Sequence, residues 1–111
     1  MSKRGDIEFL SDIKEAIKRI DEYTKEIDCG KFLKDKKTQD AVVRNLQIIG
    51  EAAKNITSDF KKKYTDIEWK KLAGLRDKIT HYYFGINWDI VWDVAKNKLP
   101  ALFGKVKDIL N

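Results

Sequence analysis

The feature that most constrains the fold of this 111-residue chain is an apolar repeat of three to four positions that runs through nearly all of it. Side chains three or four residues apart share one face of an α-helix, whereas a half-buried strand needs strict alternation. The sequence holds 6 glycines and 1 proline, so helices are interrupted rarely, and it contains no alternating stretch bounded by turn residues. These features predict an all-α fold.

The first two of four expected main helices are separated by a short loop. Asp6 is the expected cap of the first, whose apolar positions continue to Ile27, with Gly30 just beyond its end. The second is expected over about residues 38–56. Its apolar arc covers more than half of the helix circumference, which indicates packing on two sides.

The other two helices follow a lysine-rich stretch, residues 58–64, which is expected to be an exposed turn or a short helix. Thr65-Asp66-Ile67-Glu68 matches a capping box and predicts a third helix from there to about Phe84. Asn87 is the expected cap of the fourth helix, which Pro100 should kink or divide. Short connections favour an antiparallel bundle of four main helices.

Composition limits the class of protein. The chain is 42% hydrophobic and 37% charged, which suits one folded domain over residues 1–111 rather than a disordered chain. The single Cys29 excludes an intramolecular disulfide and fits a reducing compartment, so we expect a cytoplasmic protein. No membrane association is expected, because no window approaches the apolar length of a spanning helix.

The net charge of +5 and the isoelectric point of about 9.2 permit an anionic partner such as RNA. Acidic and basic residues are interleaved, however, and solvated helix faces would produce the same totals. The case for a function therefore depends on specific residues.

Arg76 is the anomaly of the third helix. It falls inside a sector of apolar side chains, one turn from Leu72 and Ile79. An unpaired guanidinium is costly to bury. Arg76 must therefore extend to solvent along the edge of the stripe, pair with a carboxylate, or border a solvated groove.

His81 is the only histidine and projects about 140° from Arg76, on the polar side of the helix. An exposed surface histidine without function is one interpretation. Asp77 lies four residues earlier on the same face, where its carboxylate can hydrogen-bond the imidazole and favour the protonated form. Such pairing also occurs without function.

Arg76 and His81 suit cleavage of RNA without a metal. One histidine cannot supply a multi-ligand metal site, and no glycine-rich phosphate loop is present, so no cofactor or metal is expected. The histidine can move the protons of transphosphorylation while the arginine stabilises the charge on the phosphate. Because the reaction needs a base and an acid, one histidine per chain fits a two-fold homodimer that pools its groups.

The segment RDKITHYY, residues 76–83, matches the pattern R-x-x-x-x-H-x-Y and resembles the signature of HepT-like toxins in the HEPN superfamily. The resemblance extends to three further segments. They are TQDAVVRNLQIIGEAAKNI (residues 38–56), Ile67-Glu68-Trp69 followed by Gly74-Leu75-Arg76-Asp77, and HYYFGINWDIVWDV (residues 81–94). These segments keep the order and spacing of the family over nearly the whole chain.

The resemblance implies a homodimeric, metal-independent endoribonuclease toxin with catalytic Arg76 and His81 in a cleft at the dimer interface. It also implies a minimal nucleotidyltransferase antitoxin that silences the toxin by transferring AMP to Tyr83. Asp77 matches a polar position after the arginine and takes a supporting polar role. Tyr82, the neighbour of the modified tyrosine, suits core packing better.

Two groups of residues have open interpretations. Lys78, with the lysines at 61–63 and 34–37, either extends an RNA-binding surface or occupies solvated positions. The three tryptophans could stack bases, but their helical spacing favours core or dimer-interface positions: Trp69, Trp88 and Trp92.

Two other functions compete with the ribonuclease. A HEPN binding module that docks a nucleotidyltransferase and binds nucleotide or substrate would use Arg76 as a phosphate clamp and would not need His81. A purely structural helical dimer would need neither residue.

Overall fold

Helices make up nearly all of the computed structural model, which describes residues 4–81 and 85–111, without the side chains at positions 76, 79, 80 and 81. In chain order they are α1 (Asp6–Thr24), α2 (Cys29–Phe32), α3 (Lys36–Asn55), α4 (Ser58–Lys63), α5 (Trp69–His81), α6 (Trp88–Asp93), the π-helical turn η2 (Val94–Lys98) and α7 (Leu99–Leu110). No strand occurs in the two described ranges. The all-α prediction is confirmed.

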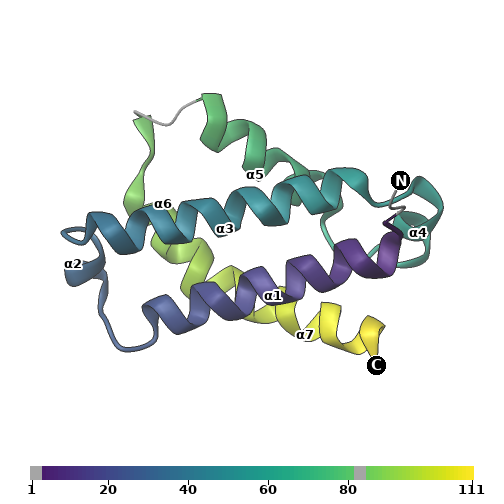
Figure 1. Ribbon diagram of the computed structural model, residues 1–111, viewed down its shortest axis with the longest axis horizontal. Coiled ribbons are helices and arrows are strands. Elements are labelled where there is room, and N and C mark those ends of the chain that lie inside the picture. Colours follow the sequence, from purple (N-terminus) through teal and green to yellow (C-terminus); the bar gives the residue numbers. More distant parts are fainter. Residues whose placement is uncertain (1–3, 82–84) are drawn as a thin grey trace.

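The long helices run in alternating directions, and α3 lies between α1 and α5 (Figure 1). The α6–η2–α7 segment passes along the other side of this layer and packs against α1 through η2 and α7. The arrangement is the expected antiparallel bundle of four main helices, to which α2 and α4 are added as short connecting helices.

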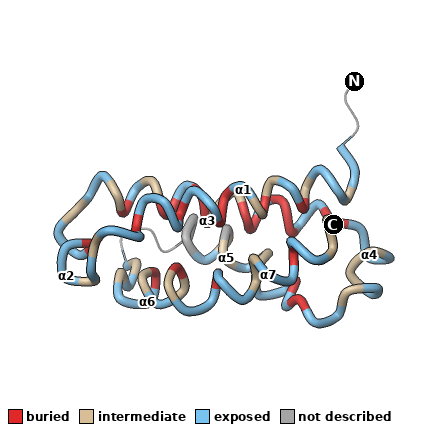
Figure 2. Tube along the Cα trace, turned by 90° about the horizontal axis from the view of Figure 1, so that it is seen from below, coloured by how far each residue is buried: buried red, intermediate tan, exposed pale blue. Residues whose placement is uncertain are grey.

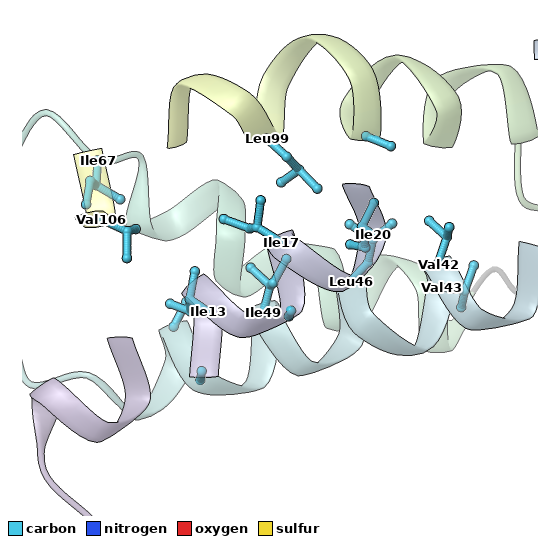
Figure 3. Close-up of a cluster of buried hydrophobic side chains, with 14 of the residues drawn as sticks. Ile13, Ile17, Ile20, Val42, Val43, Leu46, Ile49, Ile67, Leu99 and Val106 are labelled. Carbon is cyan, nitrogen blue, oxygen red and sulfur yellow. The ribbon is translucent and has the colours of Figure 1, made fainter. Parts of the chain in front are cut away.

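The core lies where these helices meet. Buried positions follow the facing sides of α1 and α3, whereas α4 has no buried residue (Figure 2). Branched aliphatic side chains from α1, α3, the loop before α5 and α7 fill the centre (Figure 3). They are Ile13, Ile17, Ile20, Val42, Val43, Leu46, Ile49, Ile67, Leu99 and Val106.

An aromatic cluster closes the end of the bundle near α2. Phe32 is fully buried, and its ring centroid lies 6.2 Å from that of Trp88 and 5.2 Å from that of Trp92. The buried Gln39 secures α2 on α3 by donating from Nε2 to the Phe32 carbonyl at 3.0 Å. Trp88 and Trp92 therefore have the packing role that their spacing favours.

The ends of the first helix differ from the prediction. Gly5 takes the N-cap position, and the Asp6 carboxylate instead accepts hydrogen bonds from Thr57 N at 2.8 Å and Thr57 Oγ1 at 2.7 Å. Two donors from a distant loop thus compete successfully for the carboxylate expected to cap locally. The helix also ends early, at Thr24, and Gly30 lies inside α2 because Asp28 caps a new helical turn through Lys31 N at 2.8 Å.

The third helix begins later than the capping box predicts. Residues 65–67 form a turn, and α5 starts at Trp69. This turn places Ile67 in the core and lets Trp69 Nε1 donate to the Tyr64 carbonyl at 2.9 Å. Burial of two large apolar side chains outweighs a cap worth about 1 kcal/mol, so the expected start at Thr65 was wrong.

The last segment keeps its predicted cap and changes helix type before the proline. Asn87 Oδ1 accepts from Ile90 N at 3.2 Å, as a cap should. The π-helical turn Val94–Lys98 follows α6, and Pro100 lies in the first turn of α7, where a backbone N–H has no helical partner in any case. The segment changes helix type just before the proline, and a kink or division at Pro100 stays a prediction.

The cap of α3 predicts a pH-dependent contribution to stability. Asp35 accepts from Thr38 N at 3.1 Å and from Thr38 Oγ1 at 2.7 Å, and these hydrogen bonds lower the pKa of its carboxyl. A carboxyl with a lowered pKa in the folded state stabilises the fold above its unfolded pKa of about 3.9 and loses this effect as the pH falls. Asp35→Ala should therefore lower the melting temperature by a few degrees at pH 7, and the difference should shrink toward pH 3.

Thermal unfolding followed by circular dichroism between pH 7 and pH 3 measures this dependence. Glu26→Ala removes an exposed carboxylate between α1 and α2 and serves as the control. A difference between Asp35→Ala and the parent protein that stays constant over this range would contradict the assignment.

Candidate active site

Helix α5 carries the Arg76–His81 pair on one continuous stretch of backbone. The helix is unbroken from Trp69 to His81, so the two positions are about 140° apart around its axis and about 7.5 Å apart along it. The side chains of both residues lie outside the described part of the structure. Residues 82–84, which include Tyr82 and Tyr83, lie outside it altogether, as does the expected end of the third helix at Phe84.

The packing of α5 divides the helix into an anchored and an open side. Trp69 is buried, while Leu72 and Leu75 are half-buried against the core. Gly74 is exposed, and a Cβ placed there would meet nothing within 4 Å. The apolar sector predicted from the sequence is thus the anchored side, and one side of the motif helix remains uncovered at Gly74.

Asp77 joins α5 to α3 by an ion pair. Lys54 Nζ lies 3.3 Å from Asp77 Oδ1 and 3.4 Å from Oδ2, and the two side chains are 41% and 50% exposed. At this exposure the pair contributes little stability, but it holds a carboxylate one residue after Arg76. The expected contact between Asp77 and the His81 imidazole involves a side chain outside the described residues and stays a prediction.

The lysines suggested as one RNA-binding surface do not form one. Lys34, Lys36 and Lys37 lie near α2, whereas Lys61–Lys63 lie on α4 at the opposite end of the molecule (Figure 1). Lys78 is exposed on α5, between these two ends. Lys78 is thus the one suggested RNA-binding lysine that lies on α5, the helix that carries Arg76 and His81.

A second group of basic residues, which the sequence did not indicate, lies beside the motif helix. Lys71, Lys98 and Lys105 line, together with Glu68, a groove between α5 and the η2–α7 segment. Lys71 Nζ is 2.9 Å from Glu68 Oε2, and the hydrogen bond and charge of Lys71, followed by the charges of Lys105 and Lys98, lower the pKa of the Glu68 carboxyl. Only Lys71 has a helical spacing to Glu68, so sequence periodicity could not have found the cluster.

Among the described residues, the single thiol is not activated and the acidic residues do not form a metal-binding group. Burial, followed by the charge of Asp89, whose carboxylate oxygen is 3.8 Å from Cys29 Sγ, raises the pKa of the Cys29 thiol and keeps it protonated. Outside the masked positions, no three His, Cys, Asp or Glu residues are grouped so that they could hold a metal ion. No helix in the described ranges has the length and apolar character needed to cross a membrane.

Comparison with known proteins places the chain among ribonucleases. Residues 13–109 match the family described as Ribonuclease HepT-like. A relative from Methanocaldococcus jannaschii, named as a candidate RNase, is 47% identical over 110 residues, which are 99% of this chain and 91% of the relative. A relative from Thermococcus cleftensis, named as a candidate ribonuclease HepT, is 48% identical over 107 residues, 96% of this chain and 97% of the relative.

No solved structure matches the chain. The family match covers most of the sequence and includes α5 with the whole R-x-x-x-x-H-x-Y pattern. The chain belongs to the HepT-like ribonuclease family.

Proposed function

We propose that the protein is a metal-independent endoribonuclease toxin that acts as a homodimer, with Arg76 and His81 as its catalytic residues and Asp77 as a supporting polar group. The observation that carries this proposal is the placement of both residues on the unbroken helix α5, in a chain of the HepT-like ribonuclease family. A cytoplasmic location suits such a toxin, because its substrate RNA is there.

The reaction is a transphosphorylation. The His81 imidazole takes the proton of a ribose 2′-hydroxyl, and the 2′-oxygen attacks the adjacent phosphorus. The bond to the 5′-oxygen breaks, and an imidazolium donates a proton to this leaving group, which yields a 2′,3′-cyclic phosphate and a 5′-hydroxyl end. The Arg76 guanidinium stabilises the charge on the non-bridging oxygens.

The geometry of α5 favours a site built from two chains. Two positions about 140° apart lie on different sides of one helix, so a site that needs both groups at one phosphate is not easily built from one chain. A two-fold axis near the Gly74 side of α5, the side on which position 81 also lies, would bring the two copies of His81 to one cleft, with Arg76 extending to it from the edge of the apolar sector. His81 of one chain then acts as the base and His81 of the partner subunit as the acid.

We further propose that a minimal nucleotidyltransferase antitoxin silences the protein by transferring AMP to Tyr83. In R-x-x-x-x-H-x-Y, the tyrosine follows the arginine by seven residues. An attached AMP adds bulk and a negative phosphate, which competes with RNA for the Arg76 guanidinium.

Substitution of the two catalytic residues should abolish cleavage without unfolding the protein. His81→Ala should lower kcat by about 10²–10⁴-fold, because it removes the proton-transfer group, and Arg76→Ala by about 10²–10³-fold. The assay follows cleavage of labelled cellular RNA in EDTA and identifies the cyclic phosphate product. Arg19→Ala, at an exposed position of α1, is the matched control for loss of an arginine.

Cleavage that survives His81→Ala, or that requires magnesium, would contradict the mechanism. RNA binding without cleavage, in wild-type protein shown by intact mass to carry no nucleotide, would instead identify a binding module.

Mixing subunits tests the two-chain site. If each reaction needs the histidine of both chains, an equal and fully exchanged mixture of wild-type and His81→Ala subunits should retain about a quarter of the wild-type dimer activity. Independent sites would retain about half. Activity is measured against the fraction of variant subunits. A parallel mixture with Arg19→Ala subunits controls for any loss of activity that subunit exchange alone causes. A linear rather than a quadratic loss would refute the shared site.

Tyr83→Phe should prevent modification by the cognate nucleotidyltransferase. Incubation of the wild-type protein with this enzyme and ATP should add one or more AMP units, detected by intact mass spectrometry, and should suppress cleavage. Tyr82→Phe is the matched control and should be modified normally. Transfer to the Tyr83→Phe protein would show that another residue is the acceptor.

A further inference from the structure

A groove beside the motif helix has an apolar floor and a basic rim. It lies between α5 and the η2–α7 segment and has a volume of about 370 Å³, near the lower limit of roughly 300–1,000 Å³ for ligand pockets. Ile67, Leu72, Leu75 and Leu102 are among the apolar residues of its floor. Its rim carries Lys71, Lys98 and Lys105, and we call these three the groove lysines.

The rim has an excess of positive charge. Glu68 is the one carboxylate among the described lining residues, so the groove has three ammonium groups and a single negative charge. Lys71 pairs with it at 2.9 Å, whereas Lys105 Nζ donates to the backbone carbonyl of Asp66 at 2.7 Å, a contact that leaves its charge uncompensated. Lys71, Lys105 and Lys98 all lower the pKa of the Glu68 carboxyl, and all three line the same groove.

Most of the net positive charge of the chain belongs to the half of the sequence that forms the groove. Residues 57–111 hold 11 basic and 7 acidic side chains, whereas residues 1–56 hold 12 and 11. One of the seven acids, Asp77, is paired with Lys54 from the other half. The helices that form the groove therefore contribute most of the +5 net charge.

We propose that this groove binds the RNA strand next to the scissile phosphate, with backbone phosphates on the groove lysines and a base against the apolar floor. The inference rests on the ribonuclease function proposed above. Lys71 precedes Arg76 by five residues on α5, which is about 7.5 Å along the helix axis. A strand held at the groove thus lies within a short distance of the helix positions that would act on it.

The chemistry of the groove suits a flexible single strand better than a duplex. Lysine ammonium groups bind phosphates as point charges and read no base sequence, so the rim positions a strand without selecting it. The floor residues named above are aliphatic and can cover the face of one unstacked base. Bases are unstacked in single-stranded loops and ends, where most recognition of RNA takes place.

The test measures RNA binding and cleavage separately. A fluorescent single-stranded RNA that carries 2′-O-methyl groups throughout cannot undergo transphosphorylation, and its binding is followed by anisotropy at several salt concentrations. The triple variant Lys71→Gln, Lys98→Gln, Lys105→Gln should bind at least 10-fold more weakly. It should also reduce the slope of log K against log salt by about 2, because each contact with a single strand contributes about 0.7.

A matched control removes the same charge at the other end of the molecule. Lys31→Gln, Lys34→Gln, Lys37→Gln alters three exposed lysines near α2 and should change affinity by less than about threefold. Glu68→Gln should have the opposite effect on affinity. Loss of the carboxylate frees Lys71, so this variant should bind the RNA severalfold more tightly. Both triple variants are checked for folding by circular dichroism.

The outcomes separate this inference from the proposed function. With cleavable RNA, the groove variant should raise KM and leave kcat unchanged, whereas the His81→Ala variant lowers kcat. Equal weakening by the two triple variants would overturn the groove as a specific site, even if the wild-type protein cleaves RNA.

Binding of free AMP as tight as that of RNA, and lost in the groove variant, would overturn the assignment to an RNA strand. If the wild-type protein cleaves no RNA but still binds the methylated RNA through the groove, the proposed catalysis is overturned and the groove remains an RNA-binding site.

Discussion

The packing of α3 on two sides is the constraint on which the rest of the structure depends. Its apolar arc is too wide for one neighbour, so α1 covers one side and α5 the other (Figure 1). Helix α5 has no other long helix as close to it. Arg76 and His81 are thus positioned through contacts of α3 that lie outside the motif, and the Lys54–Asp77 pair adds a polar link to the same contact.

This dependence explains which parts of the fold the sequence could predict. The wide arc of α3, the three- and four-residue spacing and the Asn87 cap are local signals, and each is matched in the structure. The cap of the first helix and the start of the third were wrong because tertiary contacts overrode local capping signals. Asp6 bonds to Thr57, fifty-one residues away, and Ile67 packs into the core from a turn before α5. Capping patterns describe what a residue can do nearby and carry no information about such partners.

The candidate site shows the same division. Spacing in the sequence was enough to single out Arg76, His81 and Tyr83, because the residues of the proposed site are close together in it. Lys98 and Lys105 lie far from Glu68 in the sequence and meet it only at the groove between α5 and the η2–α7 segment. The net charge of +5 alone was also compatible with solvent-exposed helix faces that bind nothing. The grouping of three of the lysines at one groove is what connects positive charge to a ligand.

The division of α5 into an anchored and an open side also bears on why a chain this small would act as a dimer. Trp69, Leu72 and Leu75 use the anchored side for stability, which leaves fewer positions of the helix for catalysis. A ribonuclease of this kind needs a base, an acid and a charge-stabilising group, and the chain holds one histidine. Enlarging the site within one chain would require another helix. In the proposed dimer, a second copy of the same surface would supply the missing group without added sequence, and Gly74 would leave room for its approach.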